Sequence, residues 1–62
     1  MMDKILEYFG GPASLARALD VSPPAVSQWI LAGRVPAFRA IEIEVICYGK
    51  FKAVDMMKGA EE

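Results

Sequence analysis

The first third of the chain carries apolar residues at the spacing of two short amphipathic helices. In residues 3–9, Ile5, Leu6 and Phe9 share one face. Gly10-Gly11 then ends this helix, because glycine accepts the left-handed conformation common beyond a helix C-terminus. Pro12 suits the first position of a second helix, where its missing N–H is not needed. That helix is predicted to run to about residue 19, with three apolar side chains turned inward: Leu15, Ala16 and Leu19.

A tight turn at residues 20–22 separates the second helix from a third. Asp20 stands where a positive φ is expected, a conformation that aspartate tolerates better than most residues. Ser22 is a favourable N-cap, and proline follows it at the first helical position. The third helix is predicted to reach about residue 31, where Ala32-Gly33 closes it, and to have two faces: Val26, Trp29 and Ile30 inward, and Pro23, Pro24, Ser27, Gln28 and Leu31 outward.

The last third of the chain fits two structures. A helix from Pro36 would place four apolar residues in one stripe: Phe38, Ile41, Val45 and Tyr48. Residues 41–45 also alternate apolar and acidic residues, as a strand does, and Tyr48-Gly49 could turn a hairpin back through residues 50–54. Periodicity therefore leaves open an all-α bundle of about five helices and an α+β fold with a C-terminal β-hairpin from about residue 40. Residues from about 58 onward are predicted to form a frayed tail.

The two helices and tight turn within residues 15–29 have the layout of a helix-turn-helix, which presents its second helix to the major groove of double-stranded DNA. Gln28 is the preferred base contact, because a glutamine amide pairs with the N6 and N7 atoms of adenine through two hydrogen bonds. Ser27 could reach a base edge or a phosphate. Pro23 and Pro24 could touch a thymine methyl group, although helix initiation already explains both.

Further polar side chains are candidates for phosphate binding. Ser14 and Ser22 lie near predicted helix N-termini, whose N–H groups attract phosphate oxygens, but both could simply be caps. Arg34 follows the third helix directly and is a candidate for phosphate binding, although a first charge after a helix is also explained as an ordinary surface residue. The weaker candidates are better explained as solvated surface charges: Arg17, Arg39, Lys50 and Lys52.

The net charge of −1 weighs against nucleic-acid binding until its distribution is considered. Between Val21 and Ile41 the chain has two arginines and no acidic residue. A locally positive face on a mildly acidic protein can still bind phosphate, with weaker non-specific binding than a basic protein shows. The 62 residues, 55% of them apolar, predict one domain over 1–62, near the lower size limit for folding alone.

The composition argues against several other classes. The chain has no histidine and one cysteine, Cys47, so an internal disulfide is impossible and a zinc site has almost nothing to bind. Without a glycine-rich phosphate loop or a paired acid and base, we expect no catalytic residue, metal, cofactor or small-molecule ligand. No apolar run of about 18 residues predicts a membrane span, and no secretory leader is evident, so a reducing cytoplasm is expected. Cys47 and Trp29 are predicted to be core residues.

Four segments together closely resemble the Cro repressors of lambdoid bacteriophages: Tyr8-Phe9-Gly10, Leu15-Ala16-Arg17-Ala18-Leu19, Ala25-Val26-Ser27-Gln28-Trp29 and Ala32-Gly33-Arg34. The resemblance covers about residues 4–52 and is strongest in the helix-turn-helix. It implies a small repressor in the bacterial host's cytoplasm that binds paired operator half-sites as a homodimer, which could be weak and completed on DNA. It also implies a phosphate-binding role for Arg34, which matches an arginine with that role in the family.

The chain departs from the family pattern in the turn and in the first turn of the third helix. Asp20 replaces the usual turn glycine, and Pro23 and Pro24 replace polar base-contacting side chains of many members. The C-terminal third is helical in some members and a β-hairpin in others; residues 36–52 are closer to the helical members, so we predict the all-α fold. A second hypothesis is a helical protein-interaction module that offers a partner helix Leu31, Phe38 and Met56-Met57.

Overall fold

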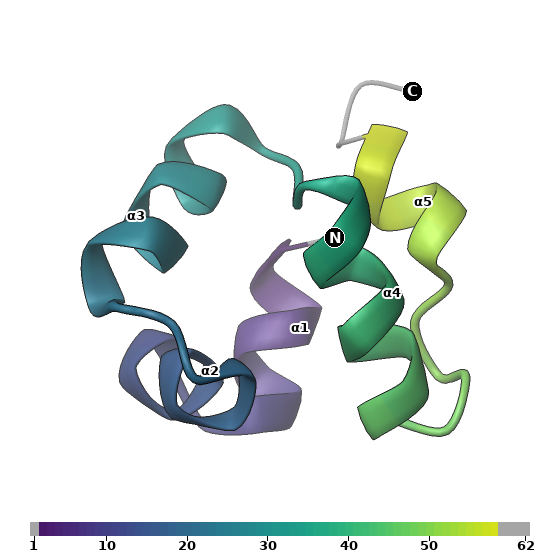
Figure 1. The fold of residues 1–62 in the computed structure, drawn as a ribbon, viewed down its shortest axis with the longest axis horizontal. Coiled ribbons are helices and arrows are strands. Elements are labelled where there is room, and N and C mark those ends of the chain that lie inside the picture. Colours follow the sequence, from purple (N-terminus) through teal and green to yellow (C-terminus); the bar gives the residue numbers. More distant parts are fainter. Residues whose placement is uncertain (1, 59–62) are drawn as a thin grey trace.

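Helix-stopping residues divide the chain into five helices in the computed structural model, which describes residues 2–58. These are α1 (Met2–Phe9), α2 (Pro12–Leu19), α3 (Pro23–Ala32), α4 (Ala37–Ile46) and α5 (Ala53–Lys58). In Figure 1, α3 forms one edge of the molecule, and α4 and α5 lie side by side in the opposite half. The all-α prediction is confirmed. The alternative hairpin is wrong, because residues 41–46 continue α4 and residues 53–58 form α5.

The tail was predicted from about residue 58; Lys58 is the last residue of α5, and the rest of that segment lies outside the described residues. Among residues 2–58, no helix combines the length and the apolar character needed to cross a membrane.

Four of the helices end in the same way. After α1, Gly10 has a φ of 96° and the N–H of Gly11 donates to the Leu6 carbonyl at 2.8 Å. Asp20 after α2, Gly33 after α3 and Tyr48 after α4 adopt the left-handed conformation, with φ values of 58°, 76° and 55°. The N–H of the following residue then reaches back to a carbonyl in the last turn, as in a Schellman motif. These hydrogen bonds are Val21 to Ala16 at 3.0 Å, Arg34 to Trp29 at 3.2 Å and Gly49 to Glu44 at 2.8 Å. The positive φ predicted for Asp20 is confirmed, and Tyr48-Gly49 ends a helix instead of turning a hairpin.

The buried side chains form one apolar cluster to which every helix contributes. Its fully buried larger members are Ile5, Leu15, Val26, Val35, Ile43 and Met56. Trp29 and Cys47 are also buried, as predicted, whereas Ile30 was placed inward and is 36% exposed. On α3 the buried residues are Val26 and Trp29, and Ile30 lies at the edge of this buried strip.

The apolar stripe that predicted α4 faces solvent. The side that α4 buries carries Ala40 and Ile43, and the cluster continues into Cys47 just beyond the helix. The predicted stripe is exposed throughout: Phe38, Ile41, Val45 and Tyr48. Because α4 is apolar on two faces, its hydrophobic period identifies the helix without showing which face meets the core.

A carboxylate fixes the start of α5. Oε1 of Glu44, on α4, accepts a hydrogen bond of 2.7 Å from the backbone N–H of Ala53, the first residue of α5. The other end of α5 accepts one as well, because the N–H of Val35 donates to the carbonyl of Met56 at 3.0 Å. Glu44 thus helps hold α5 where it supports the segment between α3 and α4.

Glu44→Ala is expected to lower the free energy of unfolding by about 1–2 kcal/mol, because it removes this charged capping group from a half-buried N–H. Glu44→Gln keeps an oxygen acceptor in place and should lose less than half as much. Urea denaturation followed by far-UV circular dichroism measures both losses. Equal stability of wild type and Glu44→Ala would contradict the role of this side chain.

Candidate nucleic-acid interface

The outer face of α3 is held toward solvent by two buried anchors on its inner face. Val26 is fully buried and Trp29 is 8% exposed. The positions opposite these anchors are all exposed: Pro24, Ser27, Gln28 and Leu31. This face therefore offers two polar side chains, Ser27 and Gln28, between two apolar ones.

The first turn of α3 is poor in side-chain donors. Ser22 is the N-cap, as predicted, and Pro23 and Pro24 follow in the first turn. The Ser22 hydroxyl makes no capping hydrogen bond, and the Ser22 carbonyl accepts one from the N–H of Ala25 at 3.0 Å. Both prolines are exposed and apolar. Hydrogen bonding by side chains on this face thus rests on Ser22 at its start and on Ser27 and Gln28 further along.

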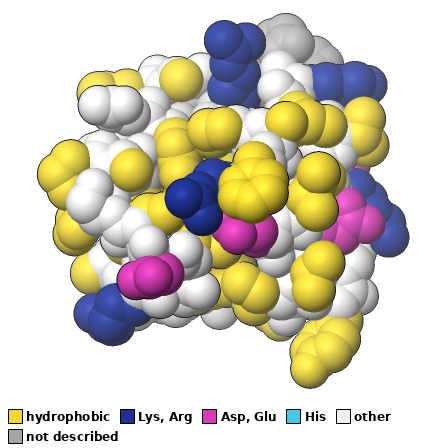
Figure 2. All heavy atoms as spheres, viewed as in Figure 1, with side chains coloured by type: hydrophobic (Ala, Val, Ile, Leu, Met, Phe, Trp, Pro, Cys, Tyr) yellow, Lys and Arg dark blue, Asp and Glu magenta, His cyan; other side chains and the backbone are white. Residues whose placement is uncertain are grey.

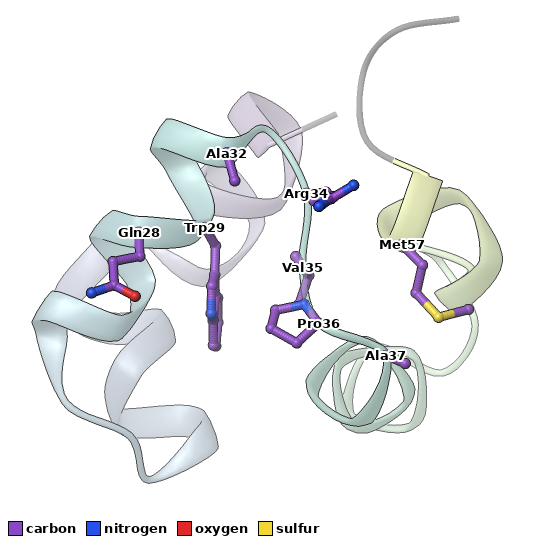
Figure 3. A pocket seen from close by; sticks show the side chains of 8 residues that line it. All are labelled: Gln28, Trp29, Ala32, Arg34, Val35, Pro36, Ala37 and Met57. Carbon is purple, nitrogen blue, oxygen red and sulfur yellow. The ribbon is translucent and has the colours of Figure 1, made fainter.

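A hollow of about 500 Å³ opens between the C-terminal half of α3 and α5. Gln28 extends from α3 on one side of it, and Arg34 extends from the α3–α4 loop on the other (Figure 3). Trp29, Val35 and Pro36 lie between them, and its remaining lining residues are Ala32, Ala37 and Met57. An amide and a guanidinium thus flank one concave surface, so this surface can donate hydrogen bonds to two separate groups of a ligand.

The N-terminus of α4 opens beside the same hollow. Pro36 is the N-cap of α4 and supplies no side-chain hydrogen bond, and Ala37, the first helical residue, lines the hollow. The first N–H groups of a helix lack intrahelical acceptors and favour an anion. This helix end was not among the phosphate contacts predicted from the sequence. The signal for it was Pro36, which marks a helix start next to Arg34.

The other predicted phosphate-binding residues are distributed unevenly. Ser14 and Arg17 are together on α2, which packs against α3, and the Arg17 guanidinium donates to Oγ of Ser14 at 3.2 Å. Arg39 lies on α4, where its guanidinium donates to a Glu42 carboxylate oxygen at 2.8 Å. The acidic partner compensates this charge, so Arg39 offers less attraction to phosphate than Arg34.

Lys50 and Lys52 lie apart from this surface. They belong to the loop between α4 and α5, which Figure 1 shows at the end of the molecule opposite α3. The Lys50 ammonium lies over the Phe51 ring, 5.8 Å from its centre. The structure thus brings Ser22, Ser27, Gln28 and Arg34 together around α3 and does not bring the two lysines to them.

The chain is similar to proteins described as transcriptional regulators. A family model described as "DNA-binding transcriptional regulator Cro" matches residues 2–61. The chain is also 49% identical over 45 residues to an Escherichia coli (strain K12) protein named "Putative transcriptional regulator YdaS". That alignment covers 61% of the chain and 46% of the relative, so the chain spans about half of that protein's length. No solved structure matches the chain.

Proposed function

The chain belongs to the Cro family of DNA-binding transcriptional regulators, and on this basis we propose that it represses transcription by occupying a two-fold-symmetric operator as a homodimer. Repression would follow from covering a promoter that overlaps the operator. No catalytic step, metal or cofactor enters this mechanism. The protein would act in the cytoplasm of a bacterial cell, where its DNA is found.

The observation that carries the proposal is the phase of α3. Val26 and Trp29 fix its inner face in the core, so Ser27 and Gln28 project outward with Arg34 nearby. We assign Gln28 to an adenine edge in the major groove and Ser27 to a base edge or phosphate. Pro23, Pro24 and Leu31 would contact thymine methyl groups.

Phosphate contacts would fix the position of α3 in the groove. Arg34 and the first N–H groups of α4 would hold the backbone on one side of α3. Ser22 would hold it at the start of α3, and Ser14 and Arg17 on α2 would add neighbouring contacts. We leave Lys50 and Lys52 out of this set because of their distance along the molecule from α3 (Figure 1).

The dimensions of the protein suit paired half-sites. The described residues extend over 26 × 25 × 20 Å. Recognition helices that enter successive major grooves on one side of the duplex are about 34 Å apart. Two copies placed side by side can have equivalent helices at this separation without a gap between the copies.

Gln28→Ala is expected to relax sequence preference at one base pair in each half-site, with a loss of about 1–3 kcal/mol of discrimination there. Affinity for the best site should fall while affinity for a site altered at that base pair changes little. Binding of wild type and variant to all single-base substitutions of the site measures this effect. Identical substitution profiles would show that Gln28 does not contact a base.

Arg34→Ala is expected to weaken binding to all sequences alike and to reduce the slope of log affinity against log salt concentration by about 1 for each half-site. Lys50→Ala removes the same charge at the opposite end of the molecule and serves as the matched control. Its salt slope should equal that of wild type. Equal slopes for the two variants would contradict the assignment of Arg34 to a phosphate.

A further inference from the structure

The exposed side of α4 carries a continuous apolar surface, which we call the α4 patch. Phe38, Ile41 and Val45 follow one another at helical spacing, and Tyr48 lies just beyond the end of the helix. The four residues are 69%, 54%, 70% and 94% exposed. A groove of about 380 Å³ lies beside them, between α2 and α4, and is lined by Ala18, Leu19, Asp20, Ile41, Glu42, Val45 and Ile46. Figure 2 shows hydrophobic side chains gathered over α4 on this face of the molecule.

We propose that the α4 patch is the surface through which two copies of this chain pair, a proposal that rests on the dimeric operator binding proposed above. Each copy would lay its α4 across that of the other about a two-fold axis and place exposed apolar side chains into the groove between α2 and α4. Such a pairing is isologous, with the same patch buried on both copies.

The size of the patch fits a weak dimer. Its side chains expose about 600 Å², if a fully exposed large apolar side chain offers about 150–250 Å². A patch of this size is at the upper end of those on monomeric proteins and is often functional. Complete burial of both patches would remove about 1,200 Å² in total from solvent, at the lower end of the range for specific interfaces. The free protein would then dimerise weakly, and two adjacent half-sites would complete the association.

The charges around the patch favour a copy of the same chain. Arg39 lies at the α4 N-terminal end of the patch, where its guanidinium is 5.5 Å from the centre of the Phe38 ring. Asp20 and Glu42 line the groove. Glu42 is paired with Arg39 of its own chain at 2.8 Å, so Asp20 is the acidic group of the groove to which a two-fold-related copy can present its arginine. No residue that lines the groove comes from α3, so pairing here leaves the outer face of α3 open.

Tyr48 supports a role for the patch outside the folded monomer. It adopts the left-handed conformation at the position of a Schellman motif where glycine is usual, and a side chain there is strained. Yet the side chain is 94% exposed and buries almost nothing within its own chain. Tyrosine is well suited to interfaces, because it adds a large contact area and keeps a polar end. Pairing would give this strained side chain a contact.

The test compares two valine variants of the full chain. Val45→Glu places a charge within the patch, and Val54→Glu places the same charge on α5 at a valine that is 53% exposed. Sedimentation equilibrium without DNA measures self-association. The probe for cooperative binding is the symmetric duplex selected from a random pool, compared with a duplex that carries one half-site.

Val45→Glu is expected to weaken self-association at least tenfold and to abolish cooperative binding, with half-site affinity within about twofold of wild type. Val54→Glu should match wild type in self-association, in cooperative binding and in half-site affinity. Wild-type self-association and cooperativity in Val45→Glu would overturn the interface and leave DNA binding standing. Loss of duplex binding by every protein, with self-association still sensitive to Val45→Glu, would overturn the proposed function and leave the interface standing.

Tyr48→Gly separates pairing from folding. Relief of the left-handed tyrosine should raise the melting temperature of the dilute monomer by about 2–5 °C. The same variant should weaken self-association several-fold, because it removes exposed apolar area from the patch. A side chain with a purely structural role would not change the melting temperature and self-association in opposite directions. Unchanged self-association of Tyr48→Gly would overturn the contribution of Tyr48 to pairing.

Discussion

Ile43→Ala is expected to leave much of the protein unfolded at 25 °C. Ile43 is fully buried in α4, and its truncation leaves a cavity in the apolar cluster to which all five helices contribute. Replacing a buried isoleucine by alanine costs about 2–5 kcal/mol. Domains below about 70 residues seldom have more than about 3–5 kcal/mol of stability in total.

Ile41→Ala is the matched control, because Ile41 lies two residues away on the same helix and is 54% exposed. Its effect on the free energy of unfolding should stay within about 0.5 kcal/mol, as is usual for surface positions. Urea denaturation followed by far-UV circular dichroism gives both values. A larger loss for Ile41→Ala than for Ile43→Ala would mean that the other face of α4 is buried.

Leu31→Glu is expected to reduce affinity for duplex DNA at least about a hundredfold, because like charges brought together at an interface cost several kcal/mol. Leu31 is 87% exposed on the outer face of α3, in the last turn of the helix, so the substitution should leave the fold unchanged. In the proposed complex the new carboxylate would enter the major groove between two phosphate backbones. Fluorescence anisotropy with a labelled duplex measures the loss.

Leu31→Gln keeps nearly the same size without the charge, and its affinity should remain within about tenfold of wild type. Circular dichroism spectra of both variants should overlay that of wild type. If Leu31→Glu bound duplex DNA as tightly as wild type, the outer face of α3 would not be the surface that meets the groove.

The helix ends of this protein were predictable because local chemistry determines them. Proline marks the starts of α2 and α3, and a residue that tolerates positive φ follows their last turns at Asp20 and Gly33. The inner face of α3 was predictable through Val26 and Trp29, although Ile30 proved to be half-exposed. These features depend on contacts within a few residues of the chain.

The C-terminal half was less predictable because long-range contacts determine it. Residues 41–45 suit a strand as well as a helix. In the structure they are helical, and α4 packs against α5 and is linked to it by the hydrogen bond from the Ala53 N–H to Glu44. Both faces of α4 are apolar, so only its neighbours decide that Ala40 and Ile43 are buried. Because Ala40 and Ile43 pack against the core, the α4 patch on the other side of the helix stays exposed.

The candidate site also has features that local sequence predicts and features that depend on long-range contacts. The outward direction of Gln28 follows from its phase on α3, and Arg34 follows α3 directly in the sequence. Their placement on two sides of one hollow depends on the bond between Val35 and Met56, which are far apart in the chain. The loop with Lys50 and Lys52 turns away from α3 because it joins α4 to α5 at the opposite end (Figure 1).

The most direct test of the account is selection from a pool of random duplexes, followed by affinity measurements on the enriched sequence across salt concentrations of about 50–200 mM. We predict a two-fold-symmetric site with half-sites about one helical turn apart, and an affinity that falls steeply as salt rises. Absence of any enriched sequence, with weak binding that does not respond to salt, would contradict operator binding. That result would favour the hypothesis of a helical protein-interaction module.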